Sequence, residues 1–260
     1  MNTSLTGSHD GTPLYDVLYL SPHPDDAALS CGGQIYLRST AGERVLIVTV
    51  AAGMPQTEVR SIFAEFQHHS WGLDANEVTA VRRSEDARAA AFLGADYHSL
   101  SLPDAIYRLH PDTGEPLYTS NDELFAMLSS AEEPMVAELA AELAQLPSAE
   151  RIVAPLSLGN HVDHQLVRAA AELAFADLLY YEDYPYVQRH PEALLAMVQP
   201  PEAWQSILYP LDEPAIHARI QAILSYESQI RVLFNDDTTM VRLVREQIDT
   251  TGGERCWHRE

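Results

Sequence analysis

The segment 44–51, which reads RVLIVTVA, constrains the fold more than any other part of the sequence. It is a continuous apolar run rich in β-branched residues, without the alternation of polar side chains that a half-exposed strand shows. Such a run is typical of a parallel strand that helices cover on both faces. Gly53 follows shortly afterwards and marks the end of the strand. The segment therefore favours an α/β fold.

Short apolar runs and helical patterns alternate along the rest of the chain. Besides 44–51, strands are predicted over 16–20, 97–102, 151–155 and 178–181. Helices are predicted over 27–38, 79–93, 132–146, 164–176, 216–234 and 239–248. This alternation predicts a Rossmann-like, mostly parallel sheet with helices on both faces. We expect a single domain over residues 14–260, preceded by a flexible tail over residues 1–13.

The composition excludes several classes of protein. The 260 residues include 38 acidic and 16 basic side chains, for a formal net charge of −22, and every basic residue is an arginine. Without lysine, the chain lacks the amine on which P-loop NTPases, protein kinases and pyridoxal-phosphate enzymes depend. The negative balance argues against binding to nucleic acids or to anionic membrane surfaces. Because no apolar signal or membrane-spanning segment is evident, we expect a cytoplasmic protein.

Two clusters of histidines and acidic residues lie at predicted strand-to-helix junctions. The first follows the strand over 16–20 and comprises His23, Asp25 and Asp26. The second follows the strand over 151–155 and comprises His161, Asp163 and His164. Because the carboxyl ends of parallel strands meet at one edge of a sheet, the two clusters can converge there. Either cluster alone could be a turn or a helix cap, but together they favour a functional site.

The spacing within the clusters suits a metal centre. His23 and Asp26 are three residues apart, which places them on one side of a helix start. One more ligand from the second cluster would complete a three-ligand site with an open position, as in catalytic zinc sites. Of His161 and His164, one could bind the metal while the other acts as an acid or an electrostatic stabiliser. Asp163 could accept a hydrogen bond from an imidazole and set its tautomer.

These motifs resemble those of the PIG-L (LmbE-like) zinc-dependent de-N-acetylases. The resemblance rests on His23-Pro-Asp-Asp, Cys31-Gly-Gly, Arg82-Arg-Ser-Glu-Asp, Leu93-Gly-Ala and His161-Val-Asp-His. It covers residues 16–182. The resemblance implies a Rossmann-like fold and the hydrolysis of an N-acyl group, usually the N-acetyl group of an amino sugar or sugar conjugate.

The resemblance also implies a role for each residue of the two clusters. The zinc ligands would be His23, Asp26 and His164, although Fe²⁺ or Mn²⁺ could take the place of zinc. Asp25 would be the general base, His161 would stabilise the oxyanion or protonate the leaving amine, and Asp163 would orient His161. The sequence departs from the family pattern at Ala27, where a glutamate is usual.

Candidate substrate-binding residues lie outside the two clusters. Related enzymes have an arginine near Arg83 and an acidic residue near Asp104 that can contact the sugar. Arg82 and Asp86, on the same predicted helix as Arg83, are interpreted as an exposed face with charge pairs. Asp104 could equally be a turn residue.

Two further residues, Glu182 and Tyr184, are candidates for the rim of the cleft. They follow the strand predicted over 178–181.

The sequence leaves two alternatives to a deacetylase of small N-acetylated sugars. A phosphoesterase with two metal ions is possible because His and Asp clusters also build such sites. It would need more ligands than the sequence offers. A sugar-binding protein that keeps the fold without catalysis is the other alternative, and Ala27 gives it some support.

Overall fold

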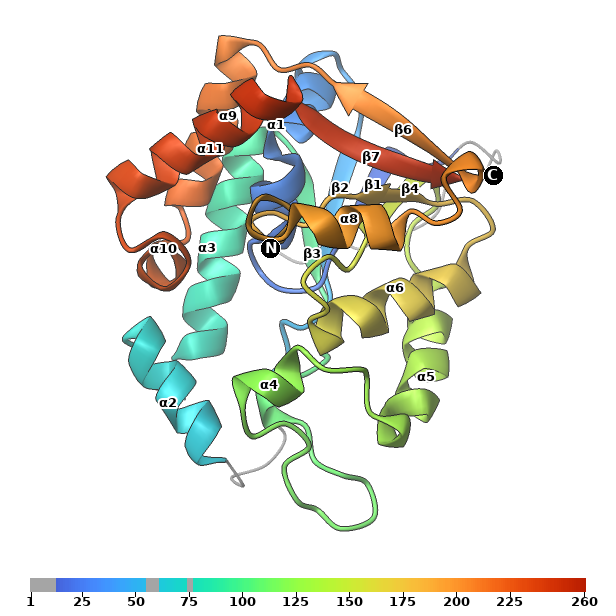
Figure 1. The fold of residues 1–260 in the computed structure, drawn as a ribbon, viewed down its shortest axis with the longest axis vertical. Helices are drawn as coiled ribbons and strands as arrows, with labels where there is room; N and C mark the ends of the chain where they lie inside the picture. Colours follow the sequence, from blue (N-terminus) through green and yellow to red (C-terminus); the bar gives the residue numbers. More distant parts are fainter. Residues whose placement is uncertain (1–12, 55–60, 74–76) are drawn as a thin grey trace.

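Seven strands of the computed structural model form one sheet, in the order β3-β2-β1-β4-β5-β7-β6 (Figure 1). The structure describes residues 13–54, 61–73 and 77–260. The strands are β1 (Tyr15–Ser21), β2 (Val45–Thr49), β3 (Asp96–Ser99), β4 (Ala149–Pro155), β5 (Leu179–Tyr181), β6 (Trp204–Tyr209) and β7 (Glu254–Arg259). The first five run parallel, whereas β7 is antiparallel to both β5 and β6. The predicted mostly parallel sheet is confirmed.

Helices cover both faces of the sheet, as predicted. The helices of the described residues are α1 (Asp26–Thr40), α2 (Ile62–Trp71), α3 (Val78–Leu93), α4 (Asn121–Leu124), α5 (Glu133–Leu143), α6 (Val162–Ala174), α7 (Tyr186–Arg189), α8 (Pro191–Met197), α9 (Glu213–Leu224), α10 (Glu227–Phe234) and α11 (Asp237–Thr251). Helices α1, α3 and α9 pack together on one side of the sheet, and α5 and α6 pack together on the other (Figure 1).

The central strand β1 shows why the sheet needs both helical layers. Val17 and Tyr19 pack with residues of α1, α3 and α9, whereas Leu18 and Leu20 pack with residues of α5 and α6. None of the four side chains is exposed to solvent. Burying each stabilises the fold by about 1.5–3 kcal/mol. The loops that leave the parallel strands therefore start from a rigid edge.

The edge of the sheet formed by the C-terminal part of the chain was not predicted. Strand β6 lies in a proline-rich stretch, whose composition favours loops, and β7 is a short strand with several polar residues. Helix α2 lies in a segment that the sequence analysis left unassigned. Most of the expected tail, residues 1–12, lies outside the described residues. None of the described helices is long and apolar enough to cross a membrane.

A pair of glycines in the middle of α1 lets two other elements contact this helix closely. Glu254 of β7 accepts a hydrogen bond from the backbone N–H of Gly33 at 2.8 Å. Arg219 of α9 donates from Nε to the carbonyl oxygen of Leu29 at 3.0 Å. A Cβ on Gly33 would overlap a neighbouring leucine side chain. These contacts anchor α1, whose first residue is Asp26, to the rest of the sheet.

Gly53 holds the loop after β2 against the loop after β3. Its N–H donates to the carbonyl oxygen of Leu102 at 2.8 Å. A Cβ on Gly53 would overlap the carbonyl oxygen of Ser101. Because Asp104 follows directly along this second loop, the close backbone contact also helps to place that carboxylate.

We expect Gly53→Ala to lower the free energy of unfolding by about 3 kcal/mol, because the obstructing atoms belong to the backbone. Gly42→Ala is a suitable control, since it adds a Cβ in open space at a φ of 91°. Its backbone strain should cost about 1 kcal/mol. Urea unfolding of both variants measures the difference, and equal losses would contradict this account of Gly53.

Candidate metal centre and active site

The loop after β1 forms a tight turn that presents the first cluster. Ser21 Oγ donates to the carbonyl oxygen of His23 at 2.7 Å and accepts from the N–H of Ala27 at 3.0 Å. Between them, Asp25 has a φ of 126°, which is uncommon for a residue with a Cβ. Backbone strain of this kind costs about 1–3 kcal/mol and clusters at functional sites. The Ala27 side chain itself packs in the apolar cluster on the α1 side of the sheet.

Asp26, the first residue of α1, brings two histidines together. Its Oδ2 accepts a hydrogen bond from the N–H of His23 at 2.8 Å. The same oxygen lies 3.2 Å from His23 Nδ1 and 3.3 Å from His164 Nε2. Burial opposes ionisation, but the charge of His164 and the hydrogen bond of the His23 imidazole hold the pKa of Asp26 well below its usual range. Asp26 is therefore an ionised carboxylate between two rings.

The remaining nitrogen of each ring contacts a buried carboxylate. His164 Nδ1 lies 2.6 Å from Asp183 Oδ1, and His23 Nε2 lies 2.8 Å from Asp163 Oδ2. Histidines that bind metals usually donate their other N–H to such a carboxylate. His164 Nε2, in turn, is buried and makes no hydrogen bond. The two imidazoles and Asp26 thus form a set of two nitrogen donors and one oxygen donor that fits a divalent metal.

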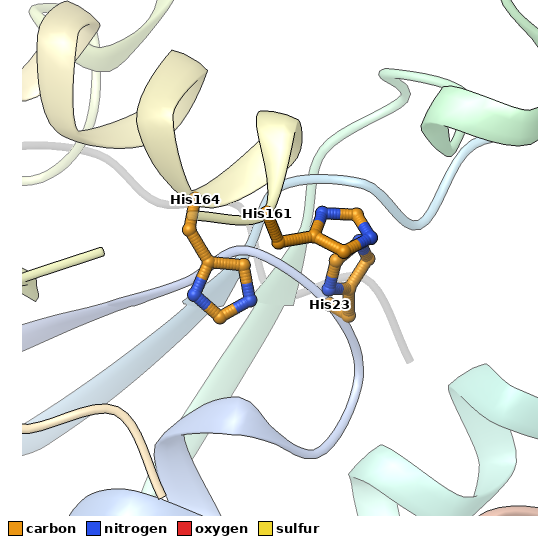
Figure 2. Close-up of side chains that lie close together, drawn as sticks. All are labelled: His23, His161 and His164. Atoms are coloured by element: carbon orange, nitrogen blue, oxygen red, sulfur yellow. The ribbon is translucent and has the colours of Figure 1, made fainter. Parts of the chain in front are cut away.

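His161 adds a third imidazole at the start of α6 (Figure 2). Nitrogen atoms of His23, His161 and His164 lie within 4.8 Å of one another. His161 Nδ1 accepts a hydrogen bond from the backbone N–H of Asp163 at 3.2 Å. Burial and the charge of His23 lower the pKa of His161 well below its usual value. The neutral ring therefore carries its proton on Nε2. His161 lines the cavity described below.

The carboxylate of Asp163 does not orient His161, contrary to the prediction from the sequence. It is fully buried and accepts hydrogen bonds from His23 Nε2, from the N–H of Ala105 at 3.1 Å and from Arg108 Nη1. Because Asp163 lies in the first turn of α6, its backbone N–H points back to the cap residue instead. Asp163 thus sets the tautomer of His161 through its main chain.

Arg108, in the long loop after β3, balances the charge of Asp163. Its Nη1 donates to Asp163, and its Nη2 donates to Glu132 Oε2 at 3.3 Å. Tyr118 donates its hydroxyl to the same oxygen of Glu132 at 2.5 Å. Burial opposes ionisation of Asp163, but the Arg108 guanidinium holds the pKa of that carboxyl well below its usual range. The long loop after β3 is therefore bound to the site by a buried ionic network.

Asp25 faces the cavity beside Arg82 of α3. Arg82 Nη2 lies 3.4 Å from Asp25 Oδ2 and donates to the carbonyl oxygen of Pro24 at 3.0 Å. Burial raises the pKa of Asp25 to about 8, although the charge of Arg82 opposes this shift. A carboxyl group with such a raised proton affinity suits proton transfer near neutral pH.

A cavity of about 300 Å³ opens over these side chains. The lining residues that carry a carboxylate, an imidazole or a guanidinium, which we name the floor, are His23, Asp25, Asp26, Arg82, Asp104 and His161. Asp104 Oδ2 lies 3.9 Å from both His23 Nε2 and Arg82 Nη1. The structure therefore brings Asp104 into the site, where a substrate could reach it.

Arg83 does not line this cavity, but it lines a smaller pocket together with Arg82 and Asp104. Its guanidinium donates to the carbonyl oxygens of Ala52 at 2.7 Å and Leu100 at 3.3 Å. Successive residues on a helix point about 100° apart, and on α3 it is Arg82 that faces the cavity. Arg82 and Asp86, expected on an exposed face, are only 8% and 3% exposed.

The segment after β5 contributes different residues from those predicted. Glu182 accepts a hydrogen bond from Trp257 Nε1 at 2.9 Å, and Tyr184 is buried, so both are parts of the interior. Asp183 instead binds an imidazole of the metal centre, and Tyr186 lines the cavity. Asp183 closely follows the end of β5, just as the two predicted clusters follow strand ends. This position in the sequence could have identified Asp183 as a residue of the site.

We expect Arg108→Met to lower the free energy of unfolding by about 3–5 kcal/mol, because Asp163 and Glu132 would stay buried without their counter-charge. Arg242→Met is the matched control, since Arg242 is exposed and pairs with Glu246 one helical turn away. That change should cost no more than about 0.5 kcal/mol. Thermal and urea unfolding measure both variants, and similar losses would contradict the role assigned to Arg108.

The chain is similar to known deacetylases in both sequence and structure. Over 237 residues the chain is 27% identical to a 2'-N-acetylparomamine deacetylase of Niallia circulans, covering 85% of this chain and 82% of that protein. The structure of a deacetylase-bog complex from the teicoplanin biosynthesis pathway is similar with a TM-score of 0.80 and 27% identity, over 94% of this chain and 98% of that one.

The zinc-inhibited form of the teicoplanin deacetylase Orf2 is similar to this chain with a TM-score of 0.77 and 26% identity, over 94% of this chain and 98% of that one. The family model for GlcNAc-PI de-N-acetylase (PIG-L) matches residues 18–175. This match includes strands β2, β3 and β4, most of β1, and both clusters of the candidate metal centre. The chain belongs to the PIG-L family of de-N-acetylases.

Proposed function

We propose that this chain is a metal-dependent hydrolase that removes the N-acetyl group from an amino sugar or sugar conjugate and releases acetate. One observation carries the proposal. Asp25 lines the same cavity as His23 and Asp26, and the buried His164 holds its Nε2 3.3 Å from Asp26 Oδ2. Similarity to deacetylases of N-acetylparomamine and of teicoplanin supports the same reaction on a sugar substrate. Residues 14–260 would act as one domain built on the single sheet.

The proposed metal ligands are His23, Asp26 and His164. A bound divalent metal would supply Lewis acidity to the amide carbonyl and to the attacking water. Zinc is the first choice, because this donor set is that of many catalytic zinc sites, and Fe²⁺ and Mn²⁺ are alternatives. Since a relative is known in a zinc-inhibited form, the metal content has to be set in any assay.

The side chains of the floor would divide the proton transfers between them. Asp25 accepts a proton from the attacking water and returns it to the nitrogen of the leaving amine. His161 donates its Nε2–H to the oxyanion that forms from the amide carbonyl. Arg82 holds the turn that carries Asp25, and Asp104 accepts a hydrogen bond from a sugar hydroxyl.

The observed ligand groups argue against the alternative of a phosphoesterase with two metals. Besides the proposed set of His23, Asp26 and His164, two groups of the described residues bring ligand atoms close together: one of His23, His161 and His164, and one of His23, Asp104 and Asp163. All three sets use His23, so they do not make two independent sites. The alternative of a sugar-binding protein without catalysis predicts no release of acetate, which the following experiment tests.

Asp25→Asn should lower kcat for acetate release by about 10²–10⁴-fold, because the variant cannot accept a proton. The assay uses methyl N-acetyl-β-glucosaminide with the metal content measured in the same preparation. Asp177→Asn, at an exposed position far from the cavity, is the matched control and should keep full activity. Unchanged turnover in Asp25→Asn with metal retained would rule out Asp25 as the base.

Removal of the metal by a chelator should abolish acetate release and lower Tm, because the folded state alone holds the complete ligand set. Adding Zn²⁺, Fe²⁺ or Mn²⁺ one at a time should restore both, with one metal per chain. His164→Ala should lose the metal, whereas His161→Ala should keep it. Loss of metal from His161→Ala would instead identify a site of three imidazoles.

A further inference from the structure

The cavity above the floor has an apolar entrance. We name as the apolar rim the side chains of Phe66, Phe125 and Val232, which line the cavity and are 59%, 38% and 44% exposed. They come from α2, from the residue after α4 and from α10. We propose, on the basis of the deacetylase activity proposed above, that the substrate carries an uncharged apolar group beside its N-acetylated sugar and that this group binds the apolar rim.

The apolar rim differs from ordinary exposed hydrophobic residues because its side chains surround one opening. Single exposed apolar side chains are common and need no explanation. Here three elements that are distant in the sequence place large apolar side chains around one opening. The buried Leu124 and the partly exposed Leu233 line the same cavity. An apolar group bound there would remove the exposed parts of the rim side chains from water, which is a favourable change.

The charges of the cavity favour an uncharged group over a cationic one. The chain as a whole carries a formal charge of −22. Yet among the described residues that line the cavity, every carboxylate, imidazole and guanidinium belongs to the floor. The other polar groups of the lining are side-chain amides, hydroxyls and an indole N–H. An ammonium group on the outer part of a substrate would therefore find no carboxylate to pair with at the apolar rim.

Phe125 joins the apolar rim to the reacting groups. Its ring lies edge-on to the ring of His161, with centroids 5.2 Å apart, and its centroid is 5.9 Å from that of Tyr186. The apolar surface thus begins within one ring's width of the imidazole that faces the amide. The apolar group of the substrate must be attached close to the acylated nitrogen, either as the aglycone of the sugar or as a longer N-acyl chain in place of the acetyl group.

Four glycosides test the proposal and separate these two sources. The reference is methyl N-acetyl-β-glucosaminide, and the other three carry a phenyl aglycone, an N-octanoyl group or a 2-aminoethyl aglycone. We expect kcat/KM to be about tenfold higher than for the methyl glycoside when the substrate carries the phenyl aglycone or the N-octanoyl group. The reason is that binding would bury about half of the apolar group. The aminoethyl glycoside should gain nothing. Calorimetric binding of the same compounds reports the preference independently of turnover.

Variants of the apolar rim assign the preference to its residues. Phe66→Ser and Val232→Ser should each lower the ratio of apolar to methyl substrate by severalfold. Ile62→Ser is the matched control, because Ile62 lies on the same helix as Phe66, is 87% exposed and does not line the cavity. It should keep the ratio of the unaltered chain.

The outcomes separate this inference from the proposed function. Acetate release without any preference for an apolar group, or a preference that Phe66→Ser and Val232→Ser leave intact, overturns the inference alone. Better turnover of the aminoethyl glycoside also overturns it. If none of the four compounds is hydrolysed under any metal, the deacetylase activity is wrong and the inference fails with it.

Discussion

The rest of the site depends on the carboxylate of Asp163. It is fully buried, and it accepts hydrogen bonds from His23 after β1 and from the N–H of Ala105 and the guanidinium of Arg108 after β3. Asp163 itself follows β4, so one side chain joins the ends of three strands. A buried carboxylate without such partners would cost several kcal/mol, on the order of the whole stability of a domain. Its pairing therefore dictates how the three loops meet.

The carboxylates around the metal centre need positive charge. Asp25, Asp26, Asp104 and Asp163 lie close together, and Arg82 and Arg108 balance only part of their charge. In the structure the imidazoles supply the rest, since the charge of Asp26 and the hydrogen bond to Asp183 raise the pKa of His164 to about 9 against the effect of burial. A dication at the same place would satisfy the same carboxylates and leave the ring neutral. Proton and metal are thus alternative occupants of one electrostatic site.

Sequence patterns could predict the parts of the fold that depend on local order along the chain. The parallel strands, the helices between them and the meeting of two clusters at one edge follow from periodicity and from the rule for carboxyl ends. The partners of the cluster residues could not be predicted, because Arg108 and Asp183 reach them through tertiary contacts. Arg82 and Arg83 point about 100° apart around the axis of α3. No pattern in the mixed sequence of this helix specifies which of the two faces the cavity.

Arginine suits the interior of this protein in a way that lysine would not. Three of the buried arginines each contact at least two groups: Arg82 the Asp25 carboxylate and the Pro24 carbonyl, Arg108 two carboxylates, and Arg219 the Leu29 carbonyl and Glu254. A planar guanidinium can donate in several directions at once and stays charged when it is buried. A lysine ammonium in the same places tends to lose its proton, which would leave the carboxylates unpaired. The absence of lysine from the chain is therefore compatible with a site held together by buried cations, because the guanidinium performs this task better.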